Sequence, residues 1–440
     1  MSNAVVGLHE TVLDNLQPHS SLKKLEICSF MGARSAMWMN NIHLISKLQY
    51  IKLENCLKWQ TLPPFWRLSF LKSLYLNNIL RVQGLDYKFN GNDKVHVFPS
   101  LEVLYIEKLE ALADWFVATA TSYECLFPCL TVLLLKECPY LQELPSCPPN
   151  LRKLEIANIG WKGLWAPKIR PRPPPDFMDQ QDCNWLQGIS NYCSISIRRC
   201  PNLISLEGHQ EMDSTGKCQL ILSELVMNDP SLLLMVPLRS ITSIQRLEIK
   251  ENYAMISFPI EADQWFLQVS SSLRYLNFRC LKSLQSLPSS LESLSSLEIL
   301  CMEDVPQLQL LPNIPASLER LELIYLESLQ CLPTSLSFSL KYLELVGIPL
   351  QKLPDLPPSL CELRLFNLEH LDCLPSCLHS ISSLLELVIY KVPQLQELPG
   401  LPPSLKSLLI EYCHPQLMER YGKYAASYEQ RFGHIHRVRI

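Results

Sequence analysis

Apolar and polar positions alternate along this chain in a short pattern that returns at intervals of roughly 20 to 30 residues. Each copy reads Leu-x-x-Leu-x-Leu or a close variant, as in the runs that begin at Leu71 and Leu318. In an extended strand the fourth and sixth side chains point to one face, and the third and fifth point to the other. The pattern therefore predicts a short strand in each copy, with one buried face and one exposed face.

The copies divide into clear and weaker examples of the same pattern. The clear copies begin at Leu22, Leu71, Leu101, Leu130, Leu151, Leu273, Leu318, Leu340, Leu360 and Leu405. The weaker copies begin at Leu48, Tyr192, Leu222, Ile244, Leu297, Leu384 and Ile435. This interval is that of leucine-rich repeats. We expect an α/β solenoid, a leucine-rich-repeat horseshoe with a concave parallel sheet, which offers a binding surface rather than a catalytic cleft.

One position after each strand is predicted to point inward, three residues beyond the sixth position of the copy. In several copies it is apolar, and in four it is a cysteine: Cys56, Cys138, Cys200 and Cys413. Such thiols could bind a metal or act as redox switches, but a buried free cysteine more often serves as a small hydrophobe. No second cysteine pair or histidine cluster stands at zinc-ligand spacing. We predict no metal site and no cofactor.

The segments that return from one strand to the next are rich in proline. Seven of them contain Leu-x-x-Leu-Pro, ending at Pro145, Pro288, Pro312, Pro333, Pro354, Pro375 and Pro399. Proline fixes φ and cannot donate to a helix, so the convex side should be irregular or extended with few short helices. Residues 111–118 are the best helix candidate there. A Pro-rich insertion near residues 160–185 is either a peptide-recognition segment or a tolerated surface loop.

Two regions follow from this pattern. Residues 1–414 form a leucine-rich-repeat array of about 16 repeats, and residues 415–440 form a C-terminal cap. In the cap, apolar side chains three or four apart between Gln416 and Phe432 predict a helix, which is followed by a final strand. At the other end Val12, Leu13 and Leu16 predict a short helix that leads into the first copy.

Composition narrows the choice of partners. The 440 residues are 48% hydrophobic and 19% charged, with a formal net charge of −4 and a pI of about 6.2. This balance argues against nucleic acid or an anionic membrane as the main partner. The chain has no signal-peptide pattern, no long apolar run and no Asn-x-Ser/Thr acceptor. We therefore expect a cytoplasmic or nucleo-cytoplasmic location.

Several phrases outside the repeat pattern carry a more specific resemblance. They include Leu16-Gln-Pro-His-Ser20, Phe98-Pro-Ser-Leu-Glu102, Lys136-Glu-Cys-Pro-Tyr140 and the final stretch from Leu401 through Cys413. In these the chain resembles the leucine-rich-repeat region of plant intracellular immune receptors of the nucleotide-binding (NLR) class. The coiled-coil subgroup of cereals is the most similar. The resemblance implies a non-catalytic recognition module of innate immunity. Its partner would be a pathogen effector, a guarded host protein or a nucleotide-binding domain absent from this chain.

The sequence also departs from that family. Ser35-Ala36 stand where Phe-Pro is usual, and Phe65-Trp66 replace a usual Leu-Gly. No phosphate-binding Gly-x-x-x-x-Gly-Lys-Ser/Thr occurs, because Gly216-Lys217-Cys218 lacks both the upstream glycine and the hydroxyl. We therefore do not extend nucleotide binding to this chain.

Exposed third and fifth positions supply the candidate binding residues. Early copies place apolar and aromatic side chains there: Tyr50, Tyr75, Val103, Tyr105, Val132 and Leu134. Exposed patches of this kind often mark partner sites, although a loop or a further domain could cover this one. Later copies mix charges and tyrosines, and they form a second candidate contact: Arg246, Tyr275, Arg320, Tyr342 and Glu344.

Other functions fit the sequence less well. A ubiquitin-ligase substrate receptor built on the same repeats needs a docking motif for which the first twenty residues are too short. A secreted receptor ectodomain would carry a signal peptide and glycosylation acceptors. We predict that the chain is not an enzyme, since it contains no nucleophile elbow, zinc-helix motif or phosphate loop.

Overall fold

A computed structural model describes most of the chain as two compact units, residues 1–222 and residues 223–440. The described residues are 3–85, 98–113, 127–142, 148, 150–160, 193–198, 222–235, 238–334, 336–421, 435 and 437–439. Residues 161–185 of the Pro-rich insertion lie outside them. So does most of the helix expected over 111–118, although residues 111–113 are not helical.

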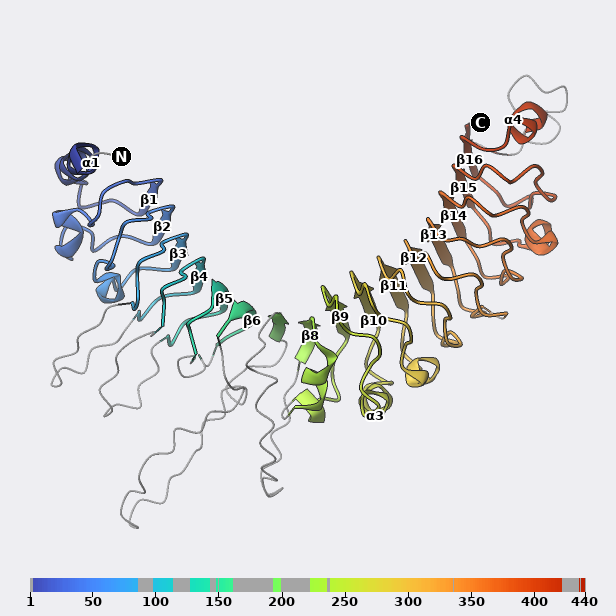
Figure 1. Ribbon diagram of the computed structural model, residues 1–440, viewed down its shortest axis with the longest axis horizontal. Helices are drawn as coiled ribbons and strands as arrows, with labels where there is room; N and C mark the ends of the chain where they lie inside the picture. The colour runs from blue at the N-terminus through green and yellow to red at the C-terminus, as the bar shows by residue number, and fades with distance from the viewer. Residues whose placement is uncertain are drawn as a thin grey trace, which may run out of the picture. The chain divides into compact units, whose positions relative to one another are not determined.

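The first unit begins with helix α1 (Asn3–Asn15) and continues with parallel strands that stand side by side (Figure 1). The strands are β1 (Lys24–Cys28), β2 (Tyr50–Glu54), β3 (Ser73–Asn77), β4 (Val103–Glu107), β5 (Val132–Cys138), β6 (Lys153–Ile159) and β7 (Cys193–Arg198). Each pairs with the next in the same register, so that Leu74 lies opposite Leu104 and Tyr75 opposite Tyr105.

The second unit repeats the arrangement. Its strands are β8 (Leu222–Met227), β9 (Arg246–Lys250), β10 (Tyr275–Arg279), β11 (Ile299–Glu303), β12 (Arg320–Ile324), β13 (Tyr342–Val346), β14 (Glu362–Phe366), β15 (Glu386–Tyr390), β16 (Ser407–Glu411) and β17 (Arg437–Arg439). All the pairs between them are parallel. The predicted leucine-rich-repeat solenoid is confirmed, and every predicted copy, weak or clear, supplies a strand.

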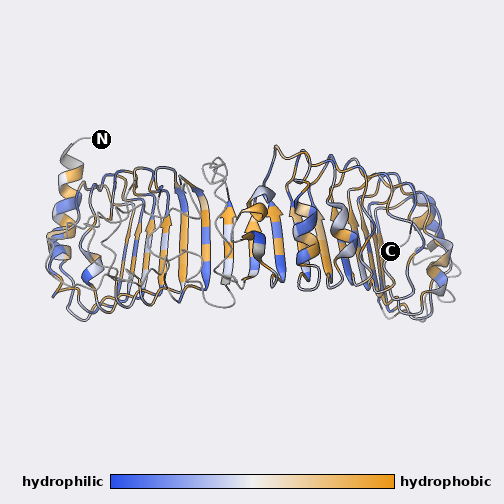
Figure 2. Ribbon diagram, turned by 90° about the horizontal axis from the view of Figure 1, so that it is seen from below, coloured by the Kyte–Doolittle hydropathy of each residue, from blue (hydrophilic) through white to orange (hydrophobic). Residues whose placement is uncertain are grey.

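Burial follows the predicted alternation along most of the described strands. Figure 2 shows hydrophobic and hydrophilic positions alternating along strands of the sheet. In β3, Leu74 and Leu76 are fully buried, while Ser73 and Tyr75 are partly exposed on the other face. The same leucine columns repeat through the described strands and form the core of each unit. Burying one leucine side chain contributes about 2 kcal/mol, so each repeat is stabilised mainly by stacking on its neighbours.

In the copy that begins at Leu222 the eighth position is Asp229, which is extended with φ of −123°. In most other copies the eighth position has a left-handed backbone. Its φ is close to 55° in most repeats, at Ser29, Asn55, Asn78, Lys108, Glu137, Asn158, Glu251, Cys280, Asp304, Tyr325, Gly347, Asn367, Lys391 and Tyr412. The N–H of this residue donates to the seventh-position carbonyl of the next repeat, as from Asn55 to Asn77 at 3.0 Å. This bond extends the strand ladder by one residue. The left-handed backbone at the same residue then turns the chain out of the sheet.

The return side is mostly extended, as predicted, and its helices are short. Those within the described residues are η1 (Met37–Asn40), η2 (Phe65–Arg67), η4 (Pro230–Leu234), η5 (Leu238–Ser240), α3 (Ala262–Gln268), η6 (Ser289–Ser293) and η7 (Ser376–Ser380). Pro288 and Pro375 stand immediately before η6 and η7, where a fixed φ suits the start of a turn.

Hydroxyls near the entrance to many strands link neighbouring repeats. Ser359 Oγ donates to the carbonyl of Leu340 at 2.8 Å, and Ser404 Oγ donates to that of Leu384 at 2.8 Å. Ser317 makes the equivalent bond to Leu297 at 2.8 Å. The serine directly before the first leucine of these copies therefore satisfies a backbone carbonyl of the preceding repeat.

Each end of the described chain carries a helix. The indole of Trp38 donates to the carbonyl of Leu13 in α1 at 2.9 Å, and Asp14 pairs with Arg34 at 2.6 Å. At the other end α4 (Pro415–Tyr421) buries Leu417. The cap helix expected over 416–432 is described only as far as Tyr421, while β17 supplies the expected final strand.

Candidate protein-interaction surface

The structure brings the six early candidates together on β2 to β5, and all six are partly exposed. They occupy two adjoining rows. In the first row Tyr50 is followed by Ser73, Val103 and Val132. In the second row Tyr75 lies opposite Tyr105, which lies opposite Leu134. We call this set the tyrosine patch (Tyr50, Tyr75, Val103, Tyr105, Val132 and Leu134); its role in binding stays a prediction.

Three tyrosines form a continuous run within this patch. The ring centroids of Tyr50 and Tyr75 are 5.2 Å apart, and those of Tyr75 and Tyr105 are 5.7 Å apart. Contacts at these distances hold the rings in place, which reduces the entropy that a partner's binding would remove. Lys24 Nζ lies 5.0 Å from the centroid of the Tyr50 ring.

The hydroxyl of Tyr105 is also fixed. It donates to the carboxylate of Glu107 on the same strand. Burial raises the pKa of Tyr105, and the hydrogen bond to Glu107 raises it further, so the hydroxyl stays protonated as a donor. The pKa of Tyr50 is likewise raised by burial.

Charged pairs surround the tyrosine patch. Lys52 and Glu54 are 2.7 Å apart at one margin. At the opposite margin the carboxylate of Glu155 forms ion pairs with Lys136 at 2.8 Å and with Arg198 at 3.2 Å. Burial alone would raise the pKa of Glu155, but the hydrogen bond from Lys136 and the nearby cations lower it below its usual range. An apolar centre with a charged margin is the common anatomy of protein interfaces.

The second candidate set lies in the other unit and divides into two arginine–tyrosine contacts. The guanidinium carbon of Arg246 lies 3.9 Å from the Tyr275 ring centroid. That of Arg320 lies 3.7 Å from the Tyr342 centroid, and Arg364, from the next repeat, lies 5.5 Å away. Tyr342 departs from the prediction, because its side chain is buried rather than exposed. Two guanidinium groups contact its ring, so a partner meets arginine there instead of tyrosine.

Carboxylates pair with all three of these arginines, and Arg246 lies 3.9 Å from Glu224. Arg320 pairs with Glu322 at 2.5 Å. Arg364 pairs with Glu362 at 3.3 Å and with Glu386 at 3.0 Å. Glu344 instead accepts the hydroxyl of Tyr342. The second set is therefore a self-paired polar surface, whose members contribute little free energy individually.

Sequence reasoning missed the seventh position, which also faces the exposed side of the sheet. Along β12 to β15 this position is apolar or aromatic, and its residues are partly exposed: Ile324, Val346, Phe366 and Tyr390. The signal was present in the sequence, since a period of two that continues past the fifth position puts the seventh on the same face.

Two of the four inward cysteines are core residues, whereas Cys413 is partly exposed and Cys200 lies outside the described residues. Cys56 and Cys138 are fully buried, and burial raises the pKa of Cys56 to about 11 and that of Cys138 to about 12. A thiol held protonated in this way is a poor nucleophile at neutral pH. Within the described part of the chain no group of three or more His, Cys, Asp or Glu side chains could hold a metal ion.

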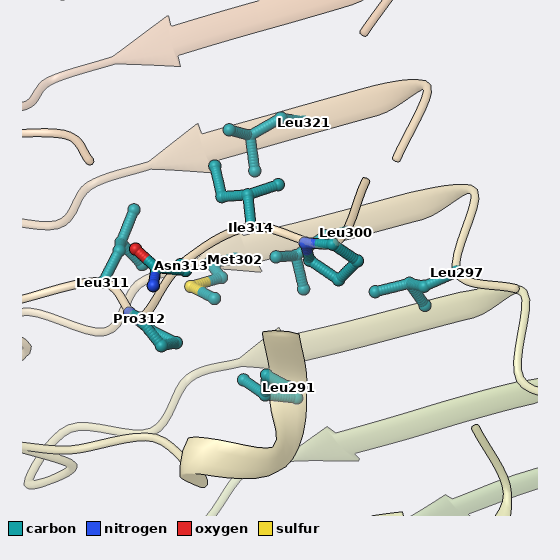
Figure 3. A pocket seen from close by; sticks show the side chains of 10 residues that line it. Leu291, Leu297, Leu300, Met302, Leu311, Pro312, Asn313, Ile314 and Leu321 are labelled. Atoms are coloured by element: carbon teal, nitrogen blue, oxygen red, sulfur yellow. The ribbon is translucent and has the colours of Figure 1, made fainter. Parts of the chain in front are cut away.

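A hollow lies inside the second unit beneath β11 and β12 (Figure 3). Leucines, Met302, Ile314 and prolines line it, and Asn313 is its one side chain with a polar end. The amide of Asn313 donates to Glu292 at 3.0 Å and is already satisfied. We interpret the hollow as a packing space of the core rather than a ligand site. Among the described helices none is long and apolar enough to cross a bilayer.

Comparison with known proteins shows which repeats these are similar to. A family model described as R13L1/DRL21 LRRs matches residues 2–79. The putative disease resistance protein At3g14460 of Arabidopsis thaliana is 29% identical over 160 residues, which are 36% of this chain and 11% of that protein. Disease resistance protein RGA2 of Solanum bulbocastanum is 28% identical over 200 residues, 44% of this chain and 18% of that protein. The chain is a leucine-rich-repeat region similar to those of plant disease resistance proteins.

These leucine-rich repeats match less than a fifth of the length of either relative. Among solved structures, the circular leucine-rich-repeat protein CroV588 is 13% identical with a TM-score of 0.45, covering 90% of this chain and 57% of that one. The assignment of leucine-rich repeats rests on the strands, registers and leucine columns of the chain itself.

Proposed function

We propose that this chain is a non-catalytic protein-recognition module of a plant disease-resistance receptor, located in the cytoplasm. Its tyrosine patch contacts a second protein, either a pathogen effector or the nucleotide-binding domain of the receptor. The observation that carries this proposal is the run of Tyr50, Tyr75 and Tyr105. Their rings contact one another and are partly exposed, and ion pairs lie at the margins of the patch.

Two physical points support a protein partner over a small ligand. The patch extends over four neighbouring strands, which at about 4.8 Å per strand spacing is wider than a small molecule needs. Tyrosine is enriched at interfaces because its ring buries much apolar area while its hydroxyl still finds a partner. The similarity to plant disease resistance proteins supports the immune context.

The test is a binding screen in plant leaf cells. The full chain is co-expressed with a panel of pathogen effectors and with nucleotide-binding domains of NLR receptors, and complexes are detected by split-luciferase signal. The double variant Tyr75→Ser/Tyr105→Ser removes the centre of the patch. We expect it to lose at least about tenfold in affinity for each partner found, because central aromatic residues contribute most to binding.

The matched control is Tyr140→Ser/Tyr253→Ser, which removes two exposed tyrosines elsewhere, 64% and 54% exposed. It should bind as the unchanged chain does. A partner whose affinity falls equally in both double variants, or in neither, would refute the proposed patch.

A further inference from the structure

A second apolar surface lies where β12 to β15 end, and the candidate set above does not include it. It consists of the seventh-position side chains of four successive repeats together with one flanking tyrosine. We call it the exit strip: Ile324, Val346, Phe366, Tyr390 and Tyr412. The first four are partly exposed, and Tyr412 is 67% exposed.

The exit strip is continuous. Ile324 lies opposite Val346, Val346 opposite Phe366, and Phe366 opposite Tyr390 in the parallel registers. The ring centroids of Phe366 and Tyr390 are 6.2 Å apart. Those of Tyr390 and Tyr412 are 5.2 Å apart at an interplanar angle of 73°. The edge of one ring thus meets the face of the next, which is a favourable arrangement for aromatic pairs.

The fold does not require apolar residues at this position. In the first unit the seventh positions of β2 to β5 are polar or charged: Glu54, Asn77, Glu107 and Lys136. In the second unit β9 to β11 carry Lys250, Arg279 and Glu303 there. The same backbone setting therefore accepts charges, and the change to Ile, Val, Phe and Tyr in consecutive repeats needs another reason. Contiguous exposed apolar surface of this kind marks interaction sites.

Charge beside the strip indicates the partner's chemistry. The third and fifth positions of β12 to β15 hold two arginines and four glutamates, a formal charge of −2: Arg320, Arg364, Glu322, Glu344, Glu362 and Glu386. Of the four carboxylates, Glu344 is the one with no Lys or Arg partner within 4.0 Å among the described ion pairs. It stands two residues before Val346 on the same strand face, about 7 Å from the strip.

We propose that the exit strip binds an extended peptide segment of another protein, one with apolar or aromatic side chains and a lysine or arginine that pairs with Glu344. The strip runs across the strands from β12 to β16. Four strand spacings of about 4.8 Å make about 19 Å, and an extended peptide covers that length with about six residues. A row of side chains this long and narrow fits one extended segment.

The test uses a phage-displayed library of random twelve-residue peptides selected on the full chain. Enriched peptides are synthesised and titrated by calorimetry against the chain and against Tyr390→Ser/Tyr412→Ser. We expect peptides with apolar side chains and a basic residue, and an affinity at least about tenfold weaker for the double variant. Glu344→Gln should weaken these peptides several-fold, and it should not affect versions whose basic residue is replaced by methionine.

The control separates this strip from the tyrosine patch. The Tyr75→Ser/Tyr105→Ser variant should bind the selected peptides unchanged. If the tyrosine-to-serine change at 390 and 412 lowers the melting temperature, Tyr412→Ser alone is used, since its side chain is mostly exposed. Enriched peptides that bind the strip variants as tightly as the unchanged chain, or the absence of any peptide that distinguishes them, would overturn the proposal.

Discussion

The side-chain amide of Asn78 donates to the amide oxygen of Asn55 across 2.7 Å, and both residues have a left-handed backbone with φ of 56°. The two occupy the eighth position of neighbouring repeats. Asparagine tolerates this conformation better than most residues because its short polar side chain bonds locally. The pair therefore stabilises the turn in two ways, through backbone preference and through a bond between repeats.

The first prediction separates these two contributions at position 78. Asn78→Val places a β-branched residue at positive φ and removes the bond, so we expect a loss of about 2–3 kcal/mol. Asn78→Gly keeps the backbone preference and loses only the bond, about 1 kcal/mol. The loss of stability in each variant is measured by its melting temperature and by amide hydrogen exchange in β3 and β4. Equal losses in the two variants would contradict this division.

The repeat pattern was enough to predict the strands, but it did not reveal the left-handed position. Asparagine marks that position at Asn55, Asn78, Asn158 and Asn367, as the conformation favours. Other repeats place lysine, glutamate or tyrosine there, and these carry no sequence signal for positive φ. A bond to the next repeat stabilises the conformation at Lys108, Glu251, Tyr325 and Lys391, and such a bond becomes visible only when the repeats are stacked.

The candidate surface was only partly predictable for a similar reason. Alternation within one strand predicts which face a side chain takes, and it placed Tyr75 and Tyr105 on the exposed face. It does not predict which side chains of the neighbouring repeats cover that residue. Tyr342 is buried because Arg320 and Arg364, from the repeats on either side, contact its ring. Contacts of this kind depend on register and on long flexible side chains.

The second prediction concerns Gly347, the glycine at the left-handed position, with φ of 62°. A Cβ there would lie 2.7 Å from Cδ1 of the Tyr325 ring. We expect Gly347→Ala to cost about 1–2 kcal/mol, partly from the backbone and partly from the displaced ring. In Tyr325→Ala/Gly347→Ala the ring is gone and only the backbone cost remains. Thermal melts of the four proteins in this cycle measure the coupling, and an additive result would exclude the steric contribution.

The third prediction concerns the hydroxyls that link repeats. Ser359→Ala removes the bond to the Leu340 carbonyl and leaves that carbonyl short of a partner, at a cost of about 1 kcal/mol. Ser286→Ala, at an exposed position of a return segment, is the matched control and should change stability by less than about 0.5 kcal/mol. Urea denaturation followed by circular dichroism compares the two. A larger effect at Ser286 than at Ser359 would show that these hydroxyls do not stabilise the stack.

The last prediction uses the raised pKa of a buried thiol. Burial raises the pKa of Cys56 to about 11 in the folded chain, whereas an unfolded cysteine titrates near 8.5. Between these two values the unfolded state has lost its proton and the folded state has kept it. The contribution of this thiol to stability is therefore unaffected well below about pH 8.5 and falls as the pH rises, by up to about 1.4 kcal/mol per pH unit.

Cys56→Ala removes the titrating group, so the stability advantage of the unchanged chain over this variant should shrink between pH 8 and pH 10. Cys331→Ala, which removes an exposed thiol, is the control and should show a constant difference over the same range. Urea denaturation at each pH measures these differences, and a constant advantage over Cys56→Ala would mean that the thiol ionises as readily in the fold as in the unfolded chain.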